Sequence, residues 1–162
     1  MDARLADYVR GQWPALVRYA TVLCGDAVEA EELVQSALVR VTLRWPFVRD
    51  KDDPGGYVKR AIVHANINHW RRVRSRETLT DHVPERATAD RSSDFADQDV
   101  VRRALAGLPP RQRAVLVLRY LDDMSEQEAA NVLGCSVGTV KSTTHKALAK
   151  LRETFAPDEV LR

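Results

Sequence analysis

Apolar residues recur at spacings of three and four along most of the chain, which is the period of an amphipathic α-helix. No stretch of the sequence shows the sustained two-residue alternation of a half-buried strand. The pattern therefore predicts an all-α protein whose helices each pack through one apolar face. With 162 residues, 44% hydrophobic and 30% charged, the chain has enough apolar material for a core without disulfides or a metal.

Three long helices are predicted in the first part of the chain, over 3–23, 27–45 and 56–74. Gly25 ends the first helix, and Asp26 with Glu29 forms the capping-box pattern that starts the second. The loop over 46–56 contains prolines, glycines and paired acids. Residues 1–74 are thus predicted to form one small helical domain.

The segment 75–97 separates this domain from a second one. It has no helical period, it carries an excess of acids, and it contains the pair Ser92 and Ser93. Such a composition predicts a flexible linker. Helical periodicity returns at residue 98, so we expect the second small helical domain over 98–156.

Local signals in the second domain predict a helix-turn-helix. Ser125 and Glu128 form a capping box that starts a short helix, and Gly134 is placed to end it. Ser136 is placed to cap the final helix, over 137–155. A short helix, a tight glycine turn and a longer helix make up this motif.

The final helix has an apolar side and an outward side with no carboxylate near its N-terminal half. The outward residues are Thr139, Lys141, Ser142, His145, Lys146 and Ala149. A recognition helix needs hydrogen-bonding groups and cations together, because it must reach base edges while it meets phosphates on both sides. A merely solvated face is the alternative, but the preceding turn favours DNA binding.

Basic residues are concentrated in two windows without acids, 54–76 and 129–152. In the first window, the outward side of the helix over 56–74 carries Arg60, His64, Ile67, Arg71 and Arg74, with Asn68 on the flank. Two separate basic surfaces suggest one extended polyanion contacted at two places, although two solvated helix faces would give the same charges.

The outward side of the helix over 27–45 carries two aliphatic residues, Val39 and Leu43, among the polar residues Glu32, Gln35 and Ser36. Aliphatic side chains on an outward face suit a contact with another protein. A helix buried on two sides of a bundle would show the same pattern, so both interpretations stay open.

Two segments resemble a known family. Residues 108–152, LPPRQRAVLVLRYLDDMSEQEAANVLGCSVGTVKSTTHKALAKLR, resemble region four of the extracytoplasmic-function sigma factors of bacterial RNA polymerase, within the sigma-70 family. The segment WPALVRYATVLCGDAVEAEELVQSALVRVTLRW and the D-P-x-x-Y-V-K-R segment resemble the start and the end of region two. Their details look most like an actinobacterial, sigma-E-like subgroup. The resemblance implies a two-domain factor that directs promoter-specific transcription initiation.

The resemblance also implies roles for individual residues. The clamp of the polymerase's largest subunit would be bound by Glu32, Leu33, Gln35, Ser36 and Val39. The minus-ten element would be recognised and opened by Arg60, His64, Asn68 and Arg71, with the loop over 46–56 capturing a flipped base. The minus-thirty-five element would be recognised by Thr139, Lys141, Ser142, His145 and Lys146.

The implied partners are core RNA polymerase, through its clamp and flap, promoter DNA and an anti-sigma factor. The chain departs from the family at Ser36, where a carboxylate is frequent, at His64, where an asparagine is common, and at Thr143, where an arginine is common. Candidates for stacking on unpaired bases are Trp45, Phe47, Tyr57 and Trp70, with burial in the bundle as the alternative.

Other classes of protein fit less well. A stand-alone helix-turn-helix regulator is the alternative, but it leaves residues 1–74 without a role. An enzyme is not expected, because the chain has no P-loop, HExxH, GxSxG or GxGxxG motif, and its four histidines do not form a metal set. We therefore expect no catalytic residue, no metal and no cofactor. Without a signal peptide or an apolar run of about 20 residues, the expected location is cytoplasmic, with no membrane insertion.

Overall fold

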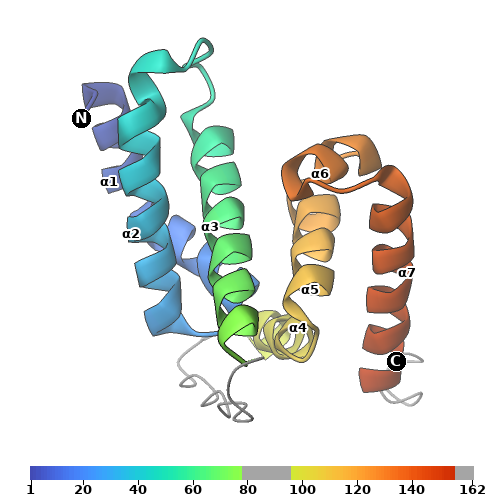
Figure 1. The fold of residues 1–162 in the computed structure, drawn as a ribbon. Helices are drawn as coiled ribbons and strands as arrows, with labels where there is room; N and C mark the ends of the chain where they lie inside the picture. The colour runs from blue at the N-terminus through green and yellow to red at the C-terminus, as the bar shows by residue number, and fades with distance from the viewer. Residues whose placement is uncertain (78–95, 156–162) are drawn as a thin grey trace. The chain divides into compact units, whose positions relative to one another are not determined.

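The computed structural model describes residues 1–77 and 96–155, and the chain divides into two compact units, Met1–Ala89 and Asp90–Arg162 (Figure 1). Every regular element in the described ranges is a helix, and these ranges contain no strand. The prediction of an all-α protein with two small helical domains is confirmed.

Unit 1, Met1–Ala89, is a bundle of three helices: α1 (Ala3–Cys24), α2 (Ala27–Arg44) and α3 (Pro54–Glu77). Figure 1 shows α2 and α3 side by side and joined at one end by a short connection, so they run antiparallel. The connection begins with a single 3-10 turn, η1 (Trp45–Phe47). The largest fully buried side chains of the unit are Leu5, Leu16, Leu23, Val34, Val41, Val58, Ile62 and Val63.

Local signals set the helix ends in unit 1. Gly25 ends α1 in the left-handed conformation, with a φ of 84° that glycine adopts without steric cost. Asp26 Oδ1 then accepts a hydrogen bond of 2.9 Å from the Glu29 N–H, as the capping pattern predicts. The Glu29 side chain does not complete the box but turns to α3, where its Oε1 lies 3.0 Å from His69 Nε2.

Unit 2, Asp90–Arg162, contains α4 (Ala96–Ala106), α5 (Pro110–Leu116), a π-helical turn η2 (Val117–Leu121), α6 (Glu126–Leu133) and α7 (Val137–Thr154). Its buried side chains come from all of these elements and from the connection between α4 and α5, and they include Leu105, Leu108, Val115, Leu118, Leu133 and Val140. Arg113 is buried with them and donates from Nη2 to the Leu108 carbonyl at 3.2 Å. The unit therefore has a core of its own.

Two details differ from the sequence pattern. Helix α3 continues to Glu77 and α4 begins at Ala96, so both ends of the predicted linker 75–97 are helical, and residues 78–95 lie outside the described part of the chain. Ile67, expected among the outward basic residues of α3, is buried. The buried sector of α3 is wider than one face, because the helix packs against both α1 and α2.

Candidate nucleic-acid and protein interfaces

The turn between α6 and α7 is held by side-chain caps on both sides. Ser125 Oγ accepts from the Glu128 N–H at 3.1 Å, while Glu128 Oε2 accepts from the Ser125 N–H at 2.7 Å, so the predicted capping box is confirmed. The hydrogen bond from the Ser125 backbone lowers the pKa of the Glu128 carboxyl. Gly134 ends α6 with a φ of 65°, and Ser136 Oγ accepts from the Thr139 N–H at 3.1 Å.

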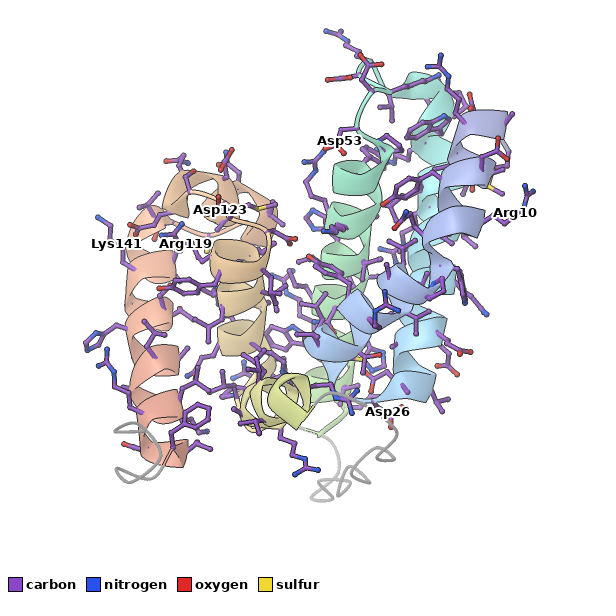
Figure 2. All side chains as sticks on the ribbon, turned by 180° about the vertical axis from the view of Figure 1, so that it is seen from behind. Arg10, Asp26, Asp53, Arg119, Asp123 and Lys141 are labelled. Atoms are coloured by element: carbon purple, nitrogen blue, oxygen red, sulfur yellow. The ribbon has the colours of Figure 1, made fainter. Side chains whose placement is uncertain are left out.

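The connection before α6 is also tightly bonded. Asp123 has a φ of 52°, which is the left-handed region, and the Met124 N–H donates to the Leu118 carbonyl at 3.0 Å. Arg119 Nη1 donates to the Met124 carbonyl and closes the loop, next to Asp123 (Figure 2). These bonds set the position at which α6, and with it the helix-turn-helix, begins.

Helix α7 is fixed in unit 2 through its apolar side. Val140 and Ala147 are completely buried, and α7 packs against both α5 and α6. Thr144 Oγ1 donates to the Val140 carbonyl at 2.7 Å, so this hydroxyl is used inside the helix. The opposite side of α7 is consequently held in a defined orientation.

That outward side carries four exposed residues of the predicted minus-thirty-five set: Lys141, Ser142, His145 and Lys146. Figure 2 shows Lys141 on the outer side of α7, pointing away from α5. The fifth predicted residue, Thr139, is half-buried, and its hydroxyl lies 2.9 Å from Ser136 Oγ. Thr139 thus serves the cap of α7, whereas the other four are accessible to a nucleic acid.

The basic side of α3 presents the predicted minus-ten residues. Arg60, His64 and Arg71 are exposed and Asn68 is half-buried, at helical spacings of four, four and three. Partial burial is the main cause that lowers the pKa of His64, and the nearby charges of Arg40 and Arg60 lower it further. Lys59 does not belong to this surface, because its Nζ lies 5.2 Å from the centre of the Tyr19 ring on α1.

The four aromatic candidates for base stacking have different surroundings. Trp45 is only 3% exposed and packs edge-to-face on Tyr57, with ring centres 5.9 Å apart, so the burial alternative is confirmed for Trp45. Tyr57 and Trp70 are half-buried. Phe47, two residues after the buried tryptophan, is 83% exposed and leaves its ring open to a partner.

The start of α3, after this loop, is closely packed against α1. Asp53 Oδ1 accepts from the Gly56 N–H at 2.8 Å and caps the helix. A Cβ atom on Gly55 would lie 2.8 Å from the Tyr8 hydroxyl oxygen, so only glycine fits without displacing that ring. Burial, and to a lesser extent the Asp53 carboxylate, raises the pKa of Tyr8.

The outward side of α2 is exposed. Val39 is 61% and Leu43 70% exposed, which excludes, for the described residues, the alternative of a helix buried on two sides. Glu32, Gln35 and Ser36 are exposed beside them. Leu33 is only 5% exposed: its side chain belongs to the core of unit 1, so it supports this surface from below.

In the described ranges, no helix is both long enough and apolar enough to span a membrane.

The amino-acid sequence is similar to two family models and to several known proteins. The Sigma-70 region 2 model matches residues 9–76, and the Sigma-70, region 4 model matches residues 98–151. The RNA polymerase sigma-E factor of Streptomyces avermitilis is 41% identical over 147 residues, which cover 91% of this chain and 82% of that protein. The ECF RNA polymerase sigma factor SigL of Mycobacterium tuberculosis is 34% identical over 145 residues, covering 86% and 82% of the two chains.

Among solved structures, the chain is similar in fold to the sigma factor RpoE of Bartonella quintana, determined in complex with the anti-sigma factor NepR. The TM-score is 0.75 at 22% identity, over 94% of this chain and 96% of that one.

Proposed function

This chain belongs to the sigma-70 family and is an RNA polymerase sigma factor of the extracytoplasmic-function type. From this premise we propose which of its surfaces bind the polymerase and which bind the promoter. Unit 1 binds the polymerase clamp through the outward side of α2. Its α3 engages the minus-ten element of the promoter. Unit 2 inserts α7 into the major groove of the minus-thirty-five element.

The exposure of Val39 and Leu43 on α2 is the observation that carries this proposal. The two residues are four positions apart on one side of α2, and adjoining exposed aliphatic side chains suit a surface that another protein covers. A stand-alone DNA-binding regulator needs α7 but has no use for such a surface in a separate unit. The polar neighbours Glu32, Gln35 and Ser36 would supply the rim of the contact.

The DNA contacts follow from the exposed groups. On α7, Lys141 and Lys146 are placed for phosphates and His145 for base edges. Ser142 Oγ donates to the Thr139 carbonyl at 3.1 Å and can still accept a hydrogen bond from a base. On α3, Arg60 and Arg71 would hold the backbone, while His64 and Asn68 supply hydrogen-bonding groups. Phe47 offers a ring on which an unpaired base can stack.

We further propose that the chain catalyses no reaction itself, that it acts in the cytoplasm with the polymerase, and that an anti-sigma factor is a partner. An inhibitor of that kind would have to cover the outward side of α2 or the basic side of α3.

Transcription in vitro tests the proposal. Purified core polymerase without a sigma subunit is expected to initiate at defined promoters only when this chain is added. The double substitution Lys141→Ala and Lys146→Ala should weaken initiation and reduce its salt dependence. The control, Arg10→Ala with Arg18→Ala on α1, removes the same charge and should leave both unchanged. A chain that binds duplex DNA tightly by itself and never confers specific initiation would instead be a stand-alone regulator.

A further inference from the structure

Arg40 on α2 is an exposed cation. It follows Glu29 by eleven residues, which is three helical turns to within about 20°, so the two share one face of α2. Glu29 contacts His69 of α3, with 3.0 Å between Oε1 and Nε2. Arg40 therefore lies on the flank of α2 that borders α3. It follows the exposed Val39 in sequence, so the two side chains are about 100° apart round the helix axis.

The antiparallel register brings Arg40 close to the basic side of α3. Because Glu29 lies opposite His69, moving eleven residues forward on α2 corresponds to moving eleven residues back on α3, to Val58. At a rise of about 1.5 Å per residue, Arg60 and His64 begin within about 9 Å of this level. The long arginine side chain spans a comparable distance.

Electrostatics agree with this placement. Besides burial, Arg40 and then Arg60 are the charges that lower the pKa of His64, so the guanidinium on α2 acts on the imidazole on α3. The residues three and four positions from Arg40 on α2 are Ser36, Ala37, Leu43 and Arg44, none of them acidic. Among the described residues, no ion pair involves Arg40 or Arg60.

We propose that Arg40 binds a phosphate of the promoter strand engaged by α3, so that the DNA surface of unit 1 extends from α3 onto α2. Two unpaired guanidiniums from different helices, Arg40 and Arg60, would hold the backbone on the two sides of His64. A guanidinium forms paired, directed hydrogen bonds with phosphate oxygens. The imidazole between them is then free to meet a base.

This inference rests on the proposed sigma-factor role, and it separates two functions on one helix. The aliphatic residues Val39 and Leu43 belong to the polymerase contact, and Arg40, on the neighbouring flank, belongs to the DNA contact. Sequence alone did not suggest Arg40, because its relation to His64 depends on how α2 and α3 pack.

The test uses holoenzyme reconstituted from core polymerase and the full chain, on a promoter fragment with an unpaired minus-ten region. Affinity is measured across a range of salt concentrations. Arg40→Ala should lower affinity about two- to fivefold at physiological salt and reduce the slope of log K against log[salt] by about one unit. Arg40→Lys should restore most of the slope, and Arg18→Ala on α1 should match the wild type.

The outcomes are distinct. An unchanged salt slope for Arg40→Ala, with wild-type holoenzyme binding normally, overturns this inference alone. Weaker binding of core polymerase with an unchanged DNA slope also overturns it and assigns Arg40 to the polymerase contact. Failure of the wild-type holoenzyme to bind any promoter fragment overturns the proposed function itself. Arg40→Lys keeps the test valid if the alanine variant is unstable.

Discussion

Glu29 in the first turn of α2 lies against His69 near the end of α3, with 3.0 Å between Glu29 Oε1 and His69 Nε2. Both side chains are largely covered, at 21% and 35% exposure, so the contact is shielded more than a surface pair. It joins the helix that bears the exposed aliphatic residues to the helix that bears the basic surface.

Removing this contact should loosen unit 1. Glu29→Gln is expected to lower the free energy of unfolding by up to about 1 kcal/mol, because it weakens a partly shielded contact between α2 and α3. A double-mutant cycle with His69→Gln, followed by urea denaturation, measures the coupling. Additive effects of the two substitutions would show that the contact contributes nothing.

The pKa of His64 gives a prediction with a definite sign. Because burial, Arg40 and Arg60 lower it below the ordinary value of 6.5, the unfolded chain binds this proton more readily than the folded one. Stability should therefore fall as the pH falls below about 6.5 and should be insensitive to His64 above it.

The measurement is an NMR titration of the His64 ring in the whole chain. Its midpoint should lie below 6.5, and Arg40→Ala should raise it, whereas Arg18→Ala should not. In parallel, His64→Asn should remove the part of the pH dependence of stability that belongs to this ring. A His64 midpoint that Arg40→Ala leaves in place would contradict the proximity of the two side chains.

Gly134 should resist replacement for a purely conformational reason. Its φ is 65°, and a Cβ atom there would meet no atom within 4 Å, so Gly134→Ala costs backbone strain alone, about 1–2 kcal/mol. Gly138→Ala is the matched control, because Gly138 lies within α7, where alanine is favoured by about 0.5–1 kcal/mol. Thermal unfolding should shift in opposite directions for the two variants.

Substitution of Phe47 should affect promoter opening, whereas substitution of Trp45 should affect the stability of unit 1. Phe47→Ala is expected to change stability by less than about 0.5 kcal/mol, since the ring is exposed, but to cost about 1–3 kcal/mol in promoter opening if a base stacks on it. Fluorescence of a base analogue in the minus-ten region reports the opening. Phe47→Trp should retain activity.

The buried neighbour provides the contrast. Trp45→Ala should destabilise unit 1 by about 3–5 kcal/mol, because it removes a large buried side chain. Normal opening by holoenzyme containing Phe47→Ala would argue against the stacking role.

Features that depend on a few neighbouring residues could be predicted from the sequence. The caps at Asp26, Ser125 and Ser136 and the stops at Gly25 and Gly134 are local, and each lies where the pattern predicts. The exposed residues of α7 also follow from helical spacing, because only one side of that helix packs.

Features that depend on packing between helices could not be predicted in this way. Spacing alone does not decide that Phe47 is exposed, nor that Ile67 is buried opposite the main core face of α3. Leu33 lies within a segment implied to bind a partner, yet its side chain fills the core. The Glu29 side chain contacts His69, a residue forty positions away, instead of completing the capping box at the start of α2.

The close approach of Tyr8 to Gly55 couples two positions that lie far apart in the chain. No side chain fits at position 55 while an aromatic hydroxyl occupies the space above it. In related sequences, a residue larger than glycine at 55 should therefore occur together with a smaller one at 8. Substitutions at these two sites would then be coupled through the packing of α1 against the start of α3.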